Sequence, residues 1–154
     1  MSDIHPFKLE IYHLLEEKLR LKIEQIELDL TGISESKAGD SKSSAGDKFE
    51  TSREMLAQEE QRLMQQLAEL RSKEIALQRL MQSEKSSDTV QLGSLVKWGG
   101  NWILIGIPEG ALSAPSLKVM CISADAPLFQ ILKGKKAGDT AQHQQKSVPI
   151  EEVL

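Results

Sequence analysis

Two carboxylates three residues apart are the side chains of this sequence best placed to do chemistry. Asp47 and Glu50 belong to the segment Gly46-Asp47-Lys48-Phe49-Glu50, which follows a stretch rich in serine, lysine and glycine. If a helix begins at this segment, the i, i+3 spacing puts both carboxylates on one face of its first turn. Carboxylate oxygens are hard ligands, so the pair could share a divalent cation.

A purely structural role for the same acids is the alternative. Negative side chains in the first turn of a helix interact favourably with its dipole, by about 0.3 to 1 kcal/mol each, and Asp47 could serve as a cap. Phe49 stands beside them, and a large apolar side chain at an exposed turn has little core to enter. We therefore expect Phe49 to pack across the turn or to contact a partner.

The other potentially reactive side chains favour roles in packing or at the surface. His5, His13 and His143 are scattered along the chain without a serine or cysteine nucleophile beside them. Cys121 lies in an apolar segment, which is typical of a buried, unreactive thiol. The sequence contains no phosphate-binding loop, dinucleotide fingerprint or zinc-ligand spacing. These patterns argue against an independent enzyme.

Three lysines form a second candidate binding surface. Lys133, Lys135 and Lys136 lie in a glycine-punctuated turn, where they could contact an acidic partner surface or nucleic acid, or could simply be solvated. The whole chain of 154 residues has 19 basic and 23 acidic side chains and a formal net charge of −4. This balance disfavours a free-standing nucleic-acid binder, because such proteins normally carry a basic excess that neutralises phosphates.

Two long helices are expected to position the acidic segment. Apolar residues recur at alternating spacings of four and three in two stretches, a pattern that predicts helices packed along one seam. The seam positions are Ile11, Leu15, Leu19, Lys22, Ile26, Leu30 and Ile33 in the first stretch, and Leu56, Glu60, Leu63, Leu67, Leu70, Glu74, Leu77 and Met81 in the second. Each helix would be about 45 Å long at 1.5 Å per residue. Folded back on each other, they place residues 34–50 at the hairpin tip, with Ser43 and Ser44 available as N-caps.

Strand and turn patterns replace the helical pattern after residue 86. Gly99, Gly100 and Asn101 separate two apolar runs, which predicts a hairpin. A further strand is predicted in residues 116–125, then a short helix opened by Pro127, and a closing hairpin through residues 148–154. The expected fold is α+β, with an antiparallel helical hairpin in residues 1–86 and a small antiparallel sheet domain with one short helix in residues 87–154.

Cysteine usage and hydropathy set the expected compartment. A single cysteine cannot form a disulfide framework, and no window approaches the ~20 apolar residues that span a bilayer. A soluble, cytoplasmic protein without membrane association is therefore expected. The sequence leaves open whether the chain is a monomer or associates weakly through spare apolar surface on the helices.

The order of these features resembles the bacterial Gre transcript-cleavage factors. That family combines an antiparallel coiled coil with an FKBP-like C-terminal domain, and its coiled-coil tip carries a Gly-Asp-x-x-Glu motif, matched here by residues 46–50. Residues 53–61 resemble the family's second helix. Residues 121–140, Cys-Ile-Ser-Ala-Asp-Ala-Pro-Leu-Phe-Gln-Ile-Leu-Lys-Gly-Lys-Lys-Ala-Gly-Asp-Thr, resemble its strand, proline-opened helix and Gly-Lys-Lys-x-Gly-Asp turn.

The resemblance implies a transcription elongation factor that binds RNA polymerase. The coiled coil would enter the polymerase secondary channel, and Asp47 and Glu50 would share a Mg²⁺ with the polymerase and assist cleavage of backtracked RNA. The protein would have no cofactor of its own, would meet transcript RNA and DNA only indirectly, and would activate another enzyme. Thr51-Ser-Arg-Glu replaces the family's usual Asn-Ala-Glu-Tyr. The alternatives are therefore a channel-binding regulator or inhibitor without cleavage activity, and a generic coiled-coil adaptor.

Overall fold

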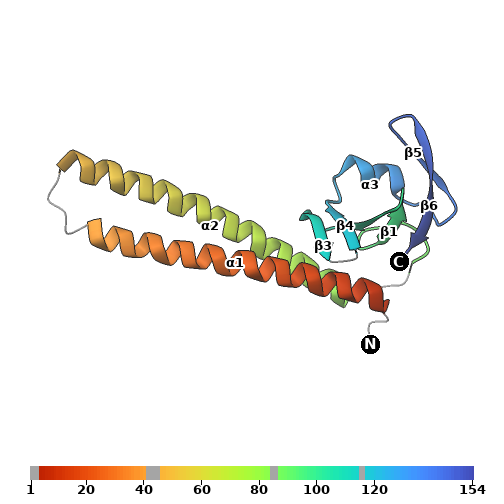
Figure 1. Ribbon diagram of the computed structural model, residues 1–154, viewed down its shortest axis with the longest axis horizontal. Helices are drawn as coiled ribbons and strands as arrows, with labels where there is room; N and C mark the ends of the chain where they lie inside the picture. Colours follow the sequence, from red (N-terminus) through yellow and green to blue (C-terminus); the bar gives the residue numbers. More distant parts are fainter. Residues whose placement is uncertain (1–3, 41–45, 84–86, 115–116) are drawn as a thin grey trace. The chain divides into compact units, whose positions relative to one another are not determined.

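The computed structural model describes residues 4–40, 46–83, 87–114 and 117–154. The chain begins with two long helices, α1 (Pro6–Asp40) and α2 (Gly46–Gln82), and a short helix α3 (Pro127–Leu132) follows later. The strands are β1 (Leu95–Trp98), β2 (Asn101–Ile105), β3 (Gly110–Ala114), β4 (Leu117–Ile122), β5 (Thr140–His143) and β6 (Lys146–Val153). The α+β fold predicted from the sequence is confirmed (Figure 1).

The described residues divide into two compact units. One unit is Glu17–Glu74, which contains most of α1 and α2; the other combines Met1–Glu16 with Ile75–Leu154. The N-terminal part of α1 and the C-terminal part of α2 thus belong to the same unit as the sheet. Among the described residues, no helix is long and apolar enough to cross a membrane.

Within the hairpin unit, α1 and α2 lie side by side and antiparallel (Figure 1). Lys37 Nζ lies 3.0 Å from the carboxylate of Glu60, and Arg71 lies 2.7 Å from the carboxylate of Glu27. These two ion pairs show the register of α1 against α2. From one pair to the other the residue number falls on α1 and rises on α2, as antiparallel helices require. The buried side chains of the seam in this unit are Leu19, Ile23, Ile26, Ile33, Leu63 and Leu70.

One position of the predicted seam is wrong. Lys22 is exposed, and its neighbour Ile23 is buried instead, with 5% of its surface accessible. Placing Ile23 four residues after Leu19 and three before Ile26 keeps the alternation of four and three, so the apolar side chain enters the seam and the ammonium group of Lys22 stays in water. The structure therefore has a more apolar seam than the one predicted.

In the part of the chain that the structure describes, six strands form one sheet in the order β3-β4-β2-β1-β6-β5. A wholly antiparallel sheet was predicted. Four of the neighbouring strand pairs described are antiparallel, but β2 and β4 pair in parallel, from Trp102 with Val119 to Ile105 with Ile122. The sheet is consequently mixed. The reason is β3, which lies between β2 and β4 in sequence, pairs with β4 and reverses the chain. β3 was not predicted, because its residues, Gly-Ala-Leu-Ser-Ala, have weak β-propensity.

Two tight turns that connect antiparallel strands lie wholly within the described residues. Gly99 and Gly100 join β1 to β2 with φ of 60° and 79°, the backbone that a two-residue type I′ hairpin requires. Gln144 and Gln145 make the equivalent turn between β5 and β6 with φ of 50° and 67°. The first turn was predicted from its glycines. The second hairpin was predicted only through its last strand, because glutamine is an uncommon residue at positive φ.

The helix α3 covers one face of the sheet (Figure 1). Its buried residues Phe129 and Leu132 pack into a cluster with strand residues that include Val96, Ile105 and Ile150. Pro127 opens this helix at its first residue, where a missing backbone N–H removes no helical hydrogen bond. The predicted strand-helix-turn succession in residues 117–139 is therefore observed.

Candidate functional site

The Gly-Asp-x-x-Glu segment begins α2 at the closed end of the hairpin. Gly46 is the first residue of the helix, so the backbone of Asp47 and Glu50 lies in its opening turns, as the sequence predicted. Glu50 is exposed. The side chains of Asp47 and Phe49 lie outside the described residues, as do Ser43 and Ser44. The segment can therefore be placed in the fold, whereas the spacing of its two carboxylates stays a prediction.

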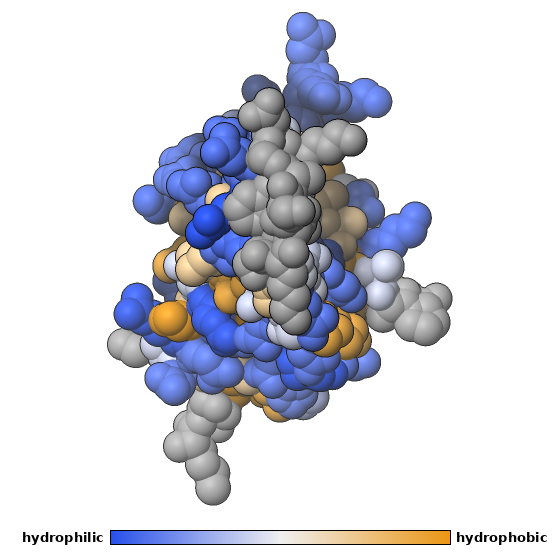
Figure 2. Space-filling model, turned by 90° about the vertical axis from the view of Figure 1, so that its left-hand side faces the viewer, coloured by the Kyte–Doolittle hydropathy of each residue, from blue (hydrophilic) through white to orange (hydrophobic). Residues whose placement is uncertain are grey.

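Figure 2 views the molecule from the side on which the hairpin closes. The described residues on this face are mostly hydrophilic, with hydrophobic residues showing between them. In the hairpin unit, several large apolar side chains are exposed, namely Leu21, Leu28, Met55 and Met64. Among the described residues, no group of three or more His, Cys, Asp or Glu side chains could hold a metal ion. Two carboxylates supply hard oxygen ligands that fit Mg²⁺, but an octahedral ion requires further ligands from elsewhere.

The predicted lysine surface lies on the turn after α3. Lys133 and Lys136 are exposed, and Lys135 is half-buried. The backbone of this turn is firmly held, since Lys136 N–H donates to the carboxylate of Asp139 at 2.8 Å and Lys135 C=O accepts from Val90 N–H at 2.8 Å. The three lysines therefore lie on one turn whose backbone is held by hydrogen bonds, and the Nζ of Lys133 lies 5.9 Å from the ring centre of Phe129. Their role as a binding surface stays a prediction.

The histidines are exposed and the cysteine is buried, positions that the sequence predicted. His5, His13 and His143 are exposed, and the rings of His143 and Trp98 form a T-shaped pair with centroids 5.8 Å apart. Cys121 is buried in β4 with 2% of its surface accessible. None of these side chains is arranged beside another as a nucleophile and base would be in the described part of the chain.

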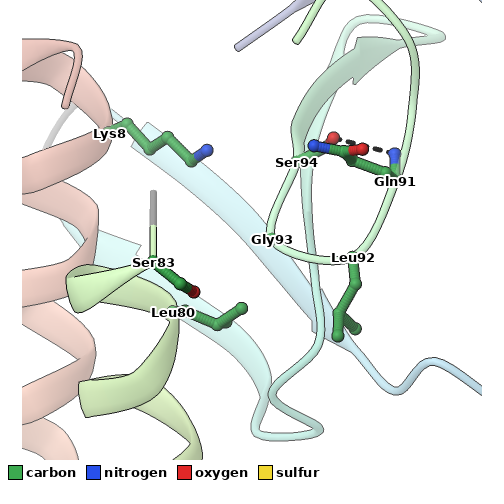
Figure 3. Close-up of a pocket in the computed structure, with 7 residues that line it drawn as sticks. All are labelled: Lys8, Leu80, Ser83, Gln91, Leu92, Gly93 and Ser94. Carbon is green, nitrogen blue, oxygen red and sulfur yellow. Dashed lines mark hydrogen bonds between the residues drawn. The ribbon is translucent and has the colours of Figure 1, made fainter. Parts of the chain in front are cut away.

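A small polar pocket lies where the helix ends meet the loop before β1 (Figure 3). Lys8 is 4% exposed, and its Nζ donates to the backbone oxygen of Leu154 at 3.3 Å. The hydroxyl of the fully buried Tyr12 donates to Gly93 C=O, also at 3.3 Å. The pocket volume of about 40 Å³ is enough for a few water molecules. These two hydrogen bonds attach the start of α1 to the C-terminal residue and to the loop before β1.

A larger, mainly apolar groove lies on the sheet and was missed by the sequence analysis. It has a volume of about 520 Å³ and is lined by β2, β3 and β4 together with Trp98 and Leu128. Trp98 and Trp102 both line it, although Trp98 is only 8% exposed and belongs to the core cluster. The sequence signal that could have indicated the groove is the alternation of side chains along β4. There Lys118 and Met120 are exposed on either side of buried Val119.

Comparisons of the chain with protein families, with curated proteins and with solved structures found no match.

Proposed function

We propose that this protein is a Gre-like transcription elongation factor, which enters the secondary channel of RNA polymerase and stimulates cleavage of backtracked RNA. The observation that carries the proposal is the position of the Gly-Asp-x-x-Glu segment at the start of α2, where the two helices of the hairpin are joined. A helical hairpin is a suitable carrier for such a segment, because it presents a few side chains at the end of a long, narrow support.

In this proposal, Asp47 and Glu50 act within the polymerase active centre. Their carboxylates would share a Mg²⁺ with acidic residues of the polymerase and hold a water molecule toward the scissile phosphodiester bond. A bound Mg²⁺ supplies charge neutralisation and lowers the pKa of that water. The protein contributes ligands and orientation, and the polymerase contributes the remaining ligands and the RNA. It is therefore an activator of another enzyme.

The sheet domain would provide the second attachment to the polymerase. Its FKBP-like character is part of the proposal, and a mixed sheet covered by α3 is compatible with it. The ordered turn with Lys133, Lys135 and Lys136 would face an acidic surface at the rim of the channel. Phe49 would contact the channel wall near the acids. Such a factor would work in the cytoplasm of a bacterium.

Cleavage of RNA in reconstituted backtracked elongation complexes tests the proposal. Asp47→Ala and Glu50→Ala should each abolish stimulated cleavage while leaving polymerase binding nearly unchanged, since the helices and the sheet domain would make most of the contact. Asp40→Ala is the matched control: it removes an acid at the end of α1, outside the motif, and should retain cleavage.

Two results would contradict the proposal in different ways. Polymerase binding without cleavage by the unmodified protein would leave a channel-occupying regulator or inhibitor. Absence of polymerase binding by the intact chain would leave the adaptor interpretation. If the two acids are only cap and dipole groups, their replacement should lower stability by about 0.5 to 2 kcal/mol without a selective catalytic effect.

A further inference from the structure

The groove on the sheet is built from two rows of side chains on the face that α3 covers. Strand register places Ile103 beside Met120, and Met120 beside Ala111. Neighbouring residues in register point to the same face of a sheet, so these three form one apolar row. Leu128 lines the groove from α3, and Met120 is 45% exposed, which leaves the row open to a ligand.

The next row on the same face is polar. Ser113 pairs with Lys118, and Asn101 pairs with Trp98. Asn101 and Lys118 each come one residue before the Trp102–Val119 pair, which puts them next to each other across β2 and β4. A hydroxyl, an ammonium group and a side-chain amide thus belong to one row at one end of the groove, where all three side chains are exposed. The amide of Asn101 donates one hydrogen bond to Gly99 C=O at 3.4 Å and has a second N–H to offer.

The arrangement of the two rows defines the chemistry of a ligand. Of the described residues that line the groove, Lys118 alone carries a charge, and the charge is positive. Hydroxyl, amide and ammonium groups can all donate hydrogen bonds to a carboxylate. The apolar row beside them can cover a hydrocarbon or aromatic body. A largely apolar pocket with a few convergent polar groups at one end is typical of a small-molecule site.

We propose that the groove binds a small monocarboxylate with an apolar body. The carboxylate lies between Lys118, Ser113 and Asn101, and the body packs on Met120 and Ile103. The volume of about 520 Å³ is within the range of about 300 to 1,000 Å³ that small-molecule pockets occupy. The inference is independent of the proposed role at the polymerase, because none of these residues belongs to the hairpin.

Intrinsic fluorescence provides a direct assay, because Trp98 lines the groove and pairs with Asn101, which places it on the same face of the sheet as the two rows. The intact protein is titrated with octanoate, and with 1-octanol as the uncharged probe of the same chain length. Octanoate should change the tryptophan emission saturably and bind at least fivefold more tightly than 1-octanol. Raising the salt concentration should weaken octanoate binding and leave 1-octanol binding unchanged, because the lysine is solvent-exposed.

Variants at the two rows locate the site. Lys118→Gln should reduce octanoate affinity about fivefold or more and bring it close to that of 1-octanol. Met120→Glu introduces a negative charge into the apolar row and should abolish octanoate binding. Lys146→Gln is the matched control, since Lys146 is an exposed lysine of the same domain on the distant strand β6. All three positions are exposed, and each variant is checked for an unchanged unfolding transition.

Several outcomes would overturn the proposal. Equal affinities for octanoate and 1-octanol, or equal losses in Lys118→Gln and Lys146→Gln, would remove the carboxylate site. Amide NMR shifts confined to the exposed leucines and methionines of the hairpin would show nonspecific binding. A peptide with an apolar C-terminal residue that binds far more tightly than octanoate would make the occupant a protein segment. Shifts confined to β2, β3 and β4 with octanoate would support the proposal.

Discussion

Gly106 illustrates how a single residue without a side chain allows helix α2 to approach the sheet. It follows β2 with φ of 129°, and a Cβ at this position would lie 3.2 Å from Leu80 Cδ1 and 3.3 Å from Leu92 Cδ1. Residues with side chains rarely adopt this backbone conformation. Both the backbone and the space therefore call for glycine at residue 106.

Replacing Gly106 by alanine should lower the free energy of unfolding by about 1 to 3 kcal/mol, because backbone strain and the contact with Leu80 and Leu92 act together. Urea unfolding followed by tryptophan fluorescence measures the change. Gly134→Ala is the control: its φ is 78°, but no atom lies within 4 Å of the added Cβ. A smaller loss of unfolding free energy in Gly134→Ala would assign the difference to the contact with Leu80 and Leu92. Equal losses in the two variants would show that this contact adds nothing to the cost of the backbone strain.

On helix α1, the exposed face is organised by ion pairs. Arg20 donates through Nε to Glu17 at 3.1 Å, one turn away, and also reaches Glu24 in the following turn. The hydrogen bond from Arg20 lowers the pKa of Glu17 below its usual value. Because the folded-state pKa is lowered, any stabilisation is present at neutral pH and is lost as the pH falls through the lowered pKa.

Arg20→Gln should accordingly raise the pKa of Glu17 toward its ordinary value, which carboxyl NMR titration of the intact chain can measure. Any difference in stability between the two proteins should narrow as the solution is acidified. Arg62→Gln serves as the matched variant, because Arg62 lowers the pKa of Glu59 in the same way on α2. Each substitution should change the pKa of its own glutamate partner only. A change in the pKa of Glu17 in the Arg62→Gln variant would contradict this local assignment.

Local patterns predicted the elements better than they predicted the pairing between them. The helices and the Gly99-Gly100 turn follow from spacing and backbone preference, which act over a few residues. The parallel pairing of β2 with β4 depends on β3, whose small residues carry little local signal. The groove depends on register across three strands, so no single segment contains its pattern. The candidate acids were predicted from a local motif, and their position at the start of α2 agrees with it.

At the scale of the molecule, the sheet unit includes the ends of both long helices. Ile11, Tyr12, Leu15 and Leu77 are completely buried in that unit. The boundary predicted from the sequence, between residues 86 and 87, would separate these side chains from the strands. Whether residues 87–154 fold alone stays a prediction, and it can be tested directly.

A shortened chain in which a flexible segment replaces residues 17–74 should retain a cooperatively folded sheet unit. About six glycine and serine residues span roughly 13 Å, enough to join helices packed about 8 to 10 Å apart. Residues 87–154 alone should unfold at a lower urea concentration, because they lack the apolar contacts of the helix ends. Tryptophan fluorescence compares the two. Identical midpoints would favour the boundary at residue 86.

Helix α1 contributes residues to both units, so its contacts form at different times during synthesis of the chain. Tyr12 and its acceptor Gly93 are 81 residues apart, so synthesis at about 5 to 20 residues per second separates them by roughly 4 to 16 s. Residues 17–74 can pair during that interval, because both helices of the hairpin are then available. The apolar face at residues 11–15 must wait for strands that the ribosome has not yet made. The first turns of the protein are consequently among the last to reach their final environment.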